Sequence, residues 1–315
     1  MESNEKRGSQ EGTKYNVLDE HYGRKERAAA RLAASPDKRI CFALLGFKTA
    51  VQEFAFLPSA RLQEVEDPPT VFHLAGALER PDLLHAVGRY TDHLRYELAV
   101  DANHGPTGQA AFTLASQIVA ALRAKSLAEF LVPAVADYSW STIAAAPERG
   151  CKIQLIEDVP QARRIAEPIE VQRADLEWVS THLTSFSSLL EDARFNLAVE
   201  ALSTHQHHPT PRMMTAVLWS GIEALFKIEH ELSFRIACYT AAVLAPRGRE
   251  RRDLYEKVKA FYAIRSKAVH GSKAKDDDLL KHVVEVRQVL SRLICTFTEA
   301  KRLPSSSELD DALFT

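Results

Sequence analysis

The spacing of apolar residues divides the chain into two parts. From Ile40 onward, short apolar runs alternate with turn residues, and this pattern predicts strands at residues 40–47, 53–58, 61–65, 70–75, 93–100 and 152–157. Residues 111–145 carry apolar residues at mixed spacings of three and four, which indicates helices. We therefore expect the first part of the chain to be an α+β domain.

Beyond residue 168 the pattern is helical almost throughout. We predict helices at residues 174–185, 188–203, 212–231, 233–244, 249–269 and 278–303. In the third of these, Met214, Leu218 and Leu225 fall on one face, as core-facing residues of a helix do. Short connections containing proline separate the helices, so the expected fold class of this part is an all-α antiparallel helical bundle.

Proline residues mark the boundary between the two parts. Pro160 and Pro168 interrupt the pattern, because proline lacks a backbone donor and restricts the residue before it. The prediction is a mobile charged arm over residues 1–37, an α+β domain over 38–168, a helical domain over 169–303 and a flexible acidic tail over 304–315. A docking peptide is the alternative for the tail.

The composition is that of an ordinary soluble globular protein, with 315 residues, 46% hydrophobic and 26% charged. No uncharged apolar run approaches the roughly 18 residues of a membrane span, so we expect a cytoplasmic protein without a membrane partner. The four cysteines are scattered, which predicts neither a disulfide framework nor a cysteine zinc site; they are Cys41, Cys151, Cys238 and Cys295.

Common catalytic signatures are missing from the sequence. It contains no phosphate-binding GxxxxGK[ST], no GxGxxG, no HExxH and no GxSxG. Residues 205–208, HQHH, form the obvious histidine cluster, but no carboxylate or cysteine stands at ligand spacing beside them. We favour a solvated loop over a metal site there, and we expect no metal and no cofactor.

One run carries a more specific pattern. In RSKAVHG, at residues 265–271, four residues separate Arg265 from His270, and Gly271 follows. This run resembles the RxxxxH signature of HEPN domains, and it is most similar to the Apea-like branch of that family. The segment WSGIEALF at 219–226 resembles the acidic helix that precedes the motif in these domains. The resemblance covers about residues 188–300.

The resemblance implies a metal-independent endoribonuclease, in which the ribose 2′-hydroxyl attacks the adjacent phosphorus and leaves a cyclic phosphate. His270 would act as general base or acid, since imidazole titrates near neutral pH. Arg265 would hold the phosphate with its planar fork. Glu223 would orient Arg265 or His270, or is an exposed carboxylate, and Ser266 would contact the scissile region. Proteins of this kind are often antiviral defence or toxin effectors.

Helix geometry sets a condition on this site. Five residues at about 100° each place Arg265 and His270 roughly 140° apart on an unbroken helix. Either the helix ends at Gly271, because glycine readily adopts the left-handed conformation that closes a helix, or two copies share the site. The resemblance implies the second arrangement, a homodimer with a composite cleft. Tyr262 lies near the face of Arg265, and core packing with its hydroxyl satisfied is the favoured role.

Local charge fits RNA as the partner. From Arg247 to Arg302 there are 15 Lys or Arg against 8 Asp or Glu, within a chain of net charge −2. A solvated basic loop is the alternative. The candidate RNA-binding residues are Arg247, Arg249, Arg251, Arg252, Lys267 and Lys273.

Two other functions stay open. One is a catalytically inactive dimerisation or RNA-binding module in which Arg265 pairs with Glu223, and the other is a metal-dependent hydrolase that uses the histidines of residues 205–208. In the leading interpretation, the N-terminal domain has a regulatory role: it senses a signal, recruits a partner or restrains the nuclease. A regulatory protein or a ligand would bind there.

Overall fold

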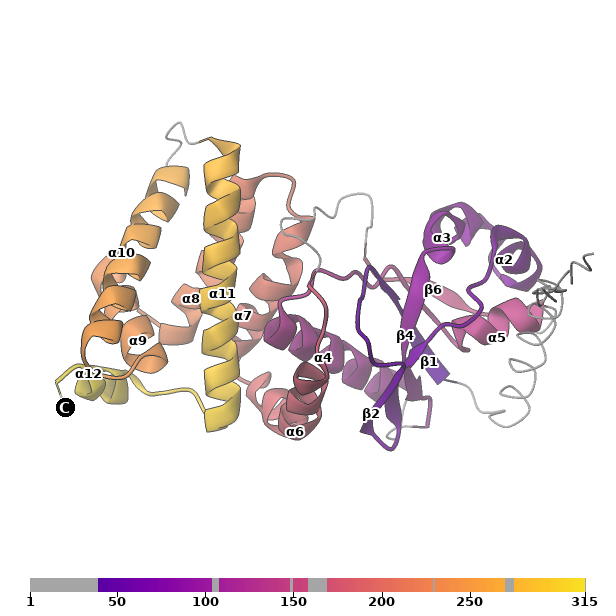
Figure 1. Ribbon diagram of the computed structural model, residues 1–315, viewed down its shortest axis with the longest axis horizontal. Coiled ribbons are helices and arrows are strands. Elements are labelled where there is room, and N and C mark those ends of the chain that lie inside the picture. The colour runs from indigo at the N-terminus through magenta and orange to yellow at the C-terminus, as the bar shows by residue number, and fades with distance from the viewer. Residues whose placement is uncertain are drawn as a thin grey trace, which may run out of the picture.

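The computed structural model describes residues 39–103, 108–147, 150–157, 169–228, 230–269 and 275–314. A β-sheet with its covering helices forms one end of the molecule, and long helices form the other (Figure 1). The expected order of an α+β part followed by a mostly helical part is therefore observed.

The sheet has six antiparallel strands in the order β2-β3-β4-β1-β5-β6. Its strands are β1 (Arg39–Leu45), β2 (Glu53–Leu57), β3 (Ala60–Glu64), β4 (Leu94–Asp101), β5 (Ala134–Ala136) and β6 (Ile153–Leu155). Successive side chains of β1 alternate between two hydrophobic clusters. Phe42 and Leu44 pack with α4 (Gly108–Ser126), whereas Cys41 and Ala43 pack with the helices on the opposite face.

Three short α-helices and a 3₁₀ turn cover that opposite face. They are α2 (Val71–Ala77), the 3₁₀ turn η1 (Pro81–Leu83), α3 (Leu84–Thr91) and α5 (Trp140–Ala145). A fully buried carboxylate begins α5, because Glu97 of β4 accepts a hydrogen bond from the backbone N–H of Trp140 at 2.7 Å. Gln63 on the neighbouring strand β3 also donates to Glu97.

One strand prediction in this part was wrong, and one strand was missed. Residues 70–75 were expected to form a strand, but Val71–Ala77 form α2, because Thr70 accepts from the backbone N–H of His73 and the His73 ring accepts from the backbone N–H of Thr70. Helices were expected within 111–145, and α4 and α5 confirm them, but the strand β5 between them was not predicted. The left-handed backbone of Leu127, with φ of 58°, follows the end of α4 and redirects the chain toward that strand.

The helices predicted for the C-terminal part are confirmed, and most of their ends agree within a few residues. They are α6 (Arg173–Leu189), α7 (Ala193–Thr204), the 3₁₀ turn η4 (His205–His207), α8 (Pro211–Phe226), α9 (Leu232–Leu244), α10 (Arg249–Val269) and α11 (Asp276–Ala300). Gly221 allows α7 and α8 to pack closely, since a Cβ atom there would lie 2.9 Å from the Cβ of Ala201.

One hydrophobic cluster runs from the sheet into the helices. It contains Phe42 of β1, Ile118 of α4, Phe186 of α6 and Leu290 of α11. Helix α4 packs against α6, α7 and α11, so it joins the two ends of the molecule. The predicted division at residue 168 falls on residues 158–168, which lie outside the described residues, as does the predicted mobile arm over 1–37. Both stay predictions.

The predicted flexible tail is a helix instead. Ser306–Phe314 form α12, which packs against α9, and its Leu309 is only 3% exposed. Ser305 precedes the helix and exchanges hydrogen bonds with Glu308. The hydroxyl of Tyr239 donates to Asp310 at 2.5 Å. Two of the acidic residues that suggested a flexible tail therefore stabilise this helix: Glu308 caps its start, and Asp310 binds it to α9.

Candidate functional site

The start of α8 lies beside the end of α10. Arg212 Nη1 donates to the carbonyl of Ala268 at 2.5 Å, which satisfies one of the carbonyls at the end of α10. Further along, the ring of Trp219 meets that of Tyr262 edge to face, with 5.2 Å between the ring centroids. These contacts bring the WSGIEALF segment and the helix of the motif together. His270 and Gly271 lie outside the described residues, so the expected helix break stays a prediction.

Arg265 and Glu223 form an ion pair between α10 and α8. Arg265 Nη2 lies 3.1 Å from Oε1 of Glu223 and donates a hydrogen bond to Oε2 at 3.4 Å. The two side chains are 22% and 23% exposed. The guanidinium also lies over the ring of Tyr262, 5.4 Å from its centroid. The interpretation of Glu223 as an exposed carboxylate is therefore wrong, because it is half-buried and holds Arg265.

Tyr262 has the role favoured from the sequence. Its side chain is 8% exposed in the core, and its hydroxyl bonds to Glu223. Burial raises the pKa of Glu223, while Arg265 and then this hydrogen bond oppose the rise. These two neighbours therefore favour the charged form of the carboxylate, against the effect of burial.

Buried polar atoms without hydrogen-bond partners occur in this pair and in the histidine that contacts Trp219. Among the described residues they include Nε of Arg265, Oε1 of Glu223 and Nδ1 of His282. Oε1 is close to Arg265 but lies outside hydrogen-bond geometry. His282 of α11 accepts from Nε1 of Trp219 at 3.2 Å, and burial lowers its pKa to about 4. Such groups are rare in folded proteins, which makes this region a candidate site.

The predicted basic residues occupy different environments. Arg247, Arg249, Arg252 and Lys267 are exposed, and Arg249 lies 3.7 Å from Asp253. Ser266 is partly buried on α10. Lys273 lies outside the described residues.

Arg251 stabilises the fold and is not part of an exposed basic surface. It donates to the carbonyls of Ala245 and Ala312, each at 3.1 Å, and so ties α12 to the α9–α10 connection. We therefore remove Arg251 from the candidate RNA-binding set.

The prediction of a solvated loop at residues 205–208 was wrong for its first half. His205 and Gln206 are buried, at 3% and 4% exposure. His205 Nδ1 contacts the carbonyl of Leu202 at 2.7 Å, so that nitrogen carries the proton, and burial lowers the pKa of His205 to about 3. Within the described ranges, no group of three or more potential ligands that could hold a metal ion was found.

His205 belongs to a buried cluster that the sequence did not indicate, and we call it the ionic joint: Arg123, Glu129, Glu157, His205 and Arg287. Arg123 binds Glu157 through two hydrogen bonds of 2.8 and 2.9 Å. Arg287 of α11 pairs with Glu129, and both side chains are less than 8% exposed. Arg287 also donates to the carbonyl of Leu127 at 3.0 Å, just after the end of α4.

Four residues of the ionic joint, Arg123, Glu129, His205 and Arg287, line a small cavity of about 10 Å³, roughly the space of one water molecule. Four atoms of its lining are buried without a partner among the described residues: Arg123 Nε, Ser203 Oγ, His205 Nε2 and Arg287 Nε. Signals in the sequence are weak here. Arg287 stands beside the apolar stripe of α11, and its partner is 158 residues away.

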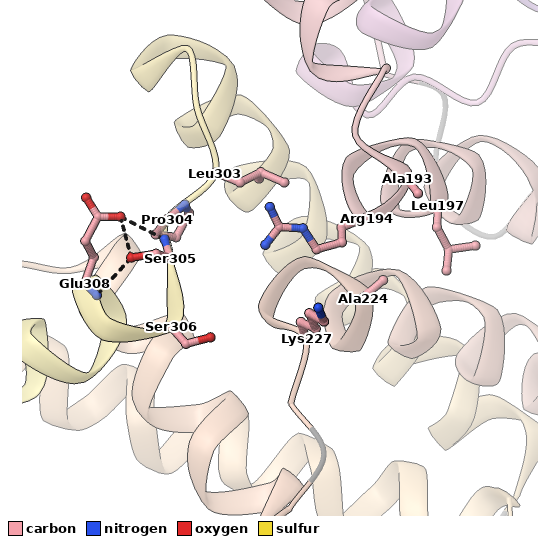
Figure 2. A pocket seen from close by; sticks show the side chains of 10 residues that line it. All are labelled: Ala193, Arg194, Leu197, Ala224, Lys227, Leu303, Pro304, Ser305, Ser306 and Glu308. Carbon is pink, nitrogen blue, oxygen red and sulfur yellow. Dashed lines mark hydrogen bonds between the residues drawn. The ribbon is translucent and has the colours of Figure 1, made fainter.

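A larger cavity, of about 850 Å³, lies between α7, α8 and the connection that leads to α12 (Figure 2). Arg194 extends toward it from α7, and Lys227 lines it at the end of α8. Arg194 is bound to Asp192 at 2.7 Å and Glu308 to Arg302 at 2.6 Å, so both groups already have partners. Neither Arg265 nor Glu223 is among the lining residues, so this cavity is separate from the candidate site.

Comparison of the chain with family models, with curated proteins and with solved structures gave no match. Among the described residues, no helix has both the length and the apolar character needed to cross a bilayer.

Proposed function

We propose that this protein is a metal-independent endoribonuclease built around Arg265. The observation that carries the proposal is the Arg265–Glu223 pair, which fixes a guanidinium between α8 and α10 next to the end of the motif helix. The contacts with Glu223 are made by Nη2 of Arg265, and the proposal assigns Nη1 to the phosphate oxygens, since Nε is buried. A charge fixed before the reaction costs no reorganisation when negative charge develops on phosphorus.

In the proposed reaction, the ribose 2′-oxygen attacks the adjacent phosphorus and the bond to the 5′-oxygen breaks. The products are a 2′,3′-cyclic phosphate and a 5′-hydroxyl. His270 would take the proton from the 2′-hydroxyl or give one to the leaving oxygen, because imidazole exchanges protons near neutral pH. Glu223 acts as a positioning residue for Arg265.

The same proposal includes a homodimer. Met213 on α8 and Ile264 on α10 are 46% and 38% exposed, and both lie toward the end of the bundle where Arg212 meets Ala268. A second copy covering these apolar side chains would bring two motifs to one cleft, which would remove the helical constraint on Arg265 and His270. Sedimentation of wild type and Ile264→Glu tests this step, and a monomeric wild type would contradict it.

The test of activity uses purified protein and end-labelled RNA in excess chelator. Cleavage that yields cyclic phosphate ends, and that is lost in both Arg265→Ala and His270→Ala, supports the proposal. Arg173→Ala is the matched control, because Arg173 is an exposed arginine on α6, outside the candidate RNA-binding set. Unchanged cleavage in His270→Ala would refute the proposed mechanism, and a requirement for metal would favour a different class of hydrolase.

The Arg265–Glu223 pair also fits a second function, an inactive dimerisation or RNA-binding module. Glu223 neutralises Arg265, as a purely structural ion pair would. In that case Arg265→Ala changes stability or assembly, and wild-type protein leaves RNA intact. A defence or toxin role and a regulatory role of the N-terminal part belong to the first proposal, and both rest on the family resemblance alone.

A further inference from the structure

The surface between α9 and α10 combines an exposed aromatic ring with positive charge. Phe234 of α9 is 52% exposed, although phenylalanine normally packs inside. Its ring meets that of Tyr255 on α10 at 77°, with 6.3 Å between the centroids. The ammonium of Lys259 lies 5.4 Å from the centre of the Tyr255 ring. We call Phe234, Tyr255 and Lys259 the aromatic platform.

The helices that carry the aromatic platform are the basic part of the molecule. Together α9 and α10, which pack side by side (Figure 1), contain 8 Lys or Arg and 3 Asp or Glu, whereas the whole chain has a net charge of −2. Arg252 stands one turn before Tyr255 and is exposed. The charge of this surface therefore complements a polyanion.

The platform and the candidate site both have residues on the same helix, α10. Tyr255 and Arg265 are ten residues apart, which is about 15 Å along a helix and leaves them about 80° apart around its axis. Lys259 lies on the other side of Tyr255, about 40° from it and about 120° from Arg265. Val258 and Tyr262 lie on the helix surface between Tyr255 and Arg265, and both are buried, so the platform is a subsite separate from the candidate site.

We infer that the aromatic platform is a binding subsite for single-stranded RNA, on which a base stacks against Phe234 while Lys259 and Arg252 contact the backbone. The inference rests on the proposed function for its choice of RNA. Exposed rings interleaved with cations bind single strands in this way, because every base offers a flat face and every linkage a charge. A base paired in a duplex offers no such face, so duplex RNA binds less tightly.

The test is the affinity for a short fluorescein-labelled oligouridine with 2′-O-methyl groups, which lacks the hydroxyl needed for cleavage. Phe234→Ala is expected to weaken binding about tenfold or more. Lys259→Glu, a change at a fully exposed side chain, is expected to weaken it as well and to reduce its dependence on salt. Phe72→Ala is the matched control, because Phe72 is 84% exposed on α2, a helix without charged residues, and its loss should change nothing.

Equal affinity of wild type and Phe234→Ala would overturn the inference, and so would a wild type that cleaves RNA but does not bind the oligouridine. In both cases the proposed nuclease activity could still stand. Weaker binding by Phe234→Ala together with a wild type that never cleaves RNA would support the platform and reject the nuclease. An equal loss of affinity in Phe72→Ala would also overturn the inference. Any exposed aromatic ring would then contribute to binding, wherever it lies on the protein.

Discussion

The guanidinium of Arg265 lies 3.1 Å from the carboxylate of Glu223, across the interface of α10 and α8. The two residues are 42 positions apart, and Tyr262 contacts both of them. Glu223 and Tyr262 together therefore fix the position of Arg265.

Glu223→Gln is expected to lower kcat for RNA cleavage about tenfold or more, with little change in KM. The amide keeps the shape of the side chain but loses the charge-assisted hydrogen bond that orients Arg265. Single-turnover and steady-state kinetics measure the split. Glu256→Gln, an exposed change on α10, is the control. Faster cleavage by Glu223→Gln would contradict the positioning role and show that Glu223 restrains Arg265.

Arg265→Lys separates catalysis from structure. Lysine keeps the positive charge beside Glu223, so the free energy of unfolding should change by less than about 1 kcal/mol at this partly exposed pair. Cleavage should fall at least about a hundredfold, because an ammonium cannot replace the planar fork on phosphate oxygens. Urea unfolding and cleavage rates are measured on the same preparations, with Arg173→Lys, at an exposed arginine of α6, as control. A variant that cleaves normally would rule out a forked phosphate contact.

The sequence predicted the Arg265 region better than its neighbours because several signals agreed there. Helical periodicity gave α8 and α10 within a few residues, and the family resemblance selected Arg265 and Glu223 from two separate helices. The pairing itself needed the structure, because a helix pattern shows which face is buried and not what the face meets. The shape of the motif at His270 lies outside the described residues.

Other features could not be predicted for physical reasons. Arg287 and Glu129 look like surface charges, because burial of either is favourable only through a partner 158 residues away. The apolar run at 70–75 suggested a strand, but the local hydrogen bonds of Thr70 and His73 favour a helix start. Phe234 fell within the predicted bundle, and only its exposure distinguishes it from a core residue.

Glu129→Gln is expected to destabilise the protein by about 3–5 kcal/mol, because it leaves the buried guanidinium of Arg287 without a counter-charge. The free energy of unfolding in urea measures the loss. Glu177→Ala is the control, since the Arg173–Glu177 pair is exposed and should contribute about 0.5 kcal/mol or less.

The double variant Glu129→Leu with Arg287→Met tests the same pair by removing both charges at once. It should recover much of the stability lost in Glu129→Gln, because two apolar side chains leave no unpaired charge. If Glu129→Gln is as stable as wild type, the Arg287–Glu129 pair does not contribute to the free energy of unfolding.

Acid is expected to weaken the fold below pH 6.5, through His205 and His282. Burial lowers the pKa of His205 to about 3 and that of His282 to about 4, both from the ordinary value of 6.5. Between about pH 6.5 and pH 4, the unfolded chain therefore binds more protons than the folded protein. Stability falls as the pH falls, by up to about 1.4 kcal/mol per pH unit for each histidine.

Urea unfolding between pH 7 and pH 5.5 measures this slope above the ordinary titration range of carboxylates. His282→Gln retains an acceptor for Nε1 of Trp219 but cannot be protonated, so about half of the slope should disappear. The exposed His85 provides the control, and His85→Gln should leave the slope as it is in wild type. If His282→Gln retains the full slope, or if wild-type stability is flat over this range, these two buried histidines do not control the acid response.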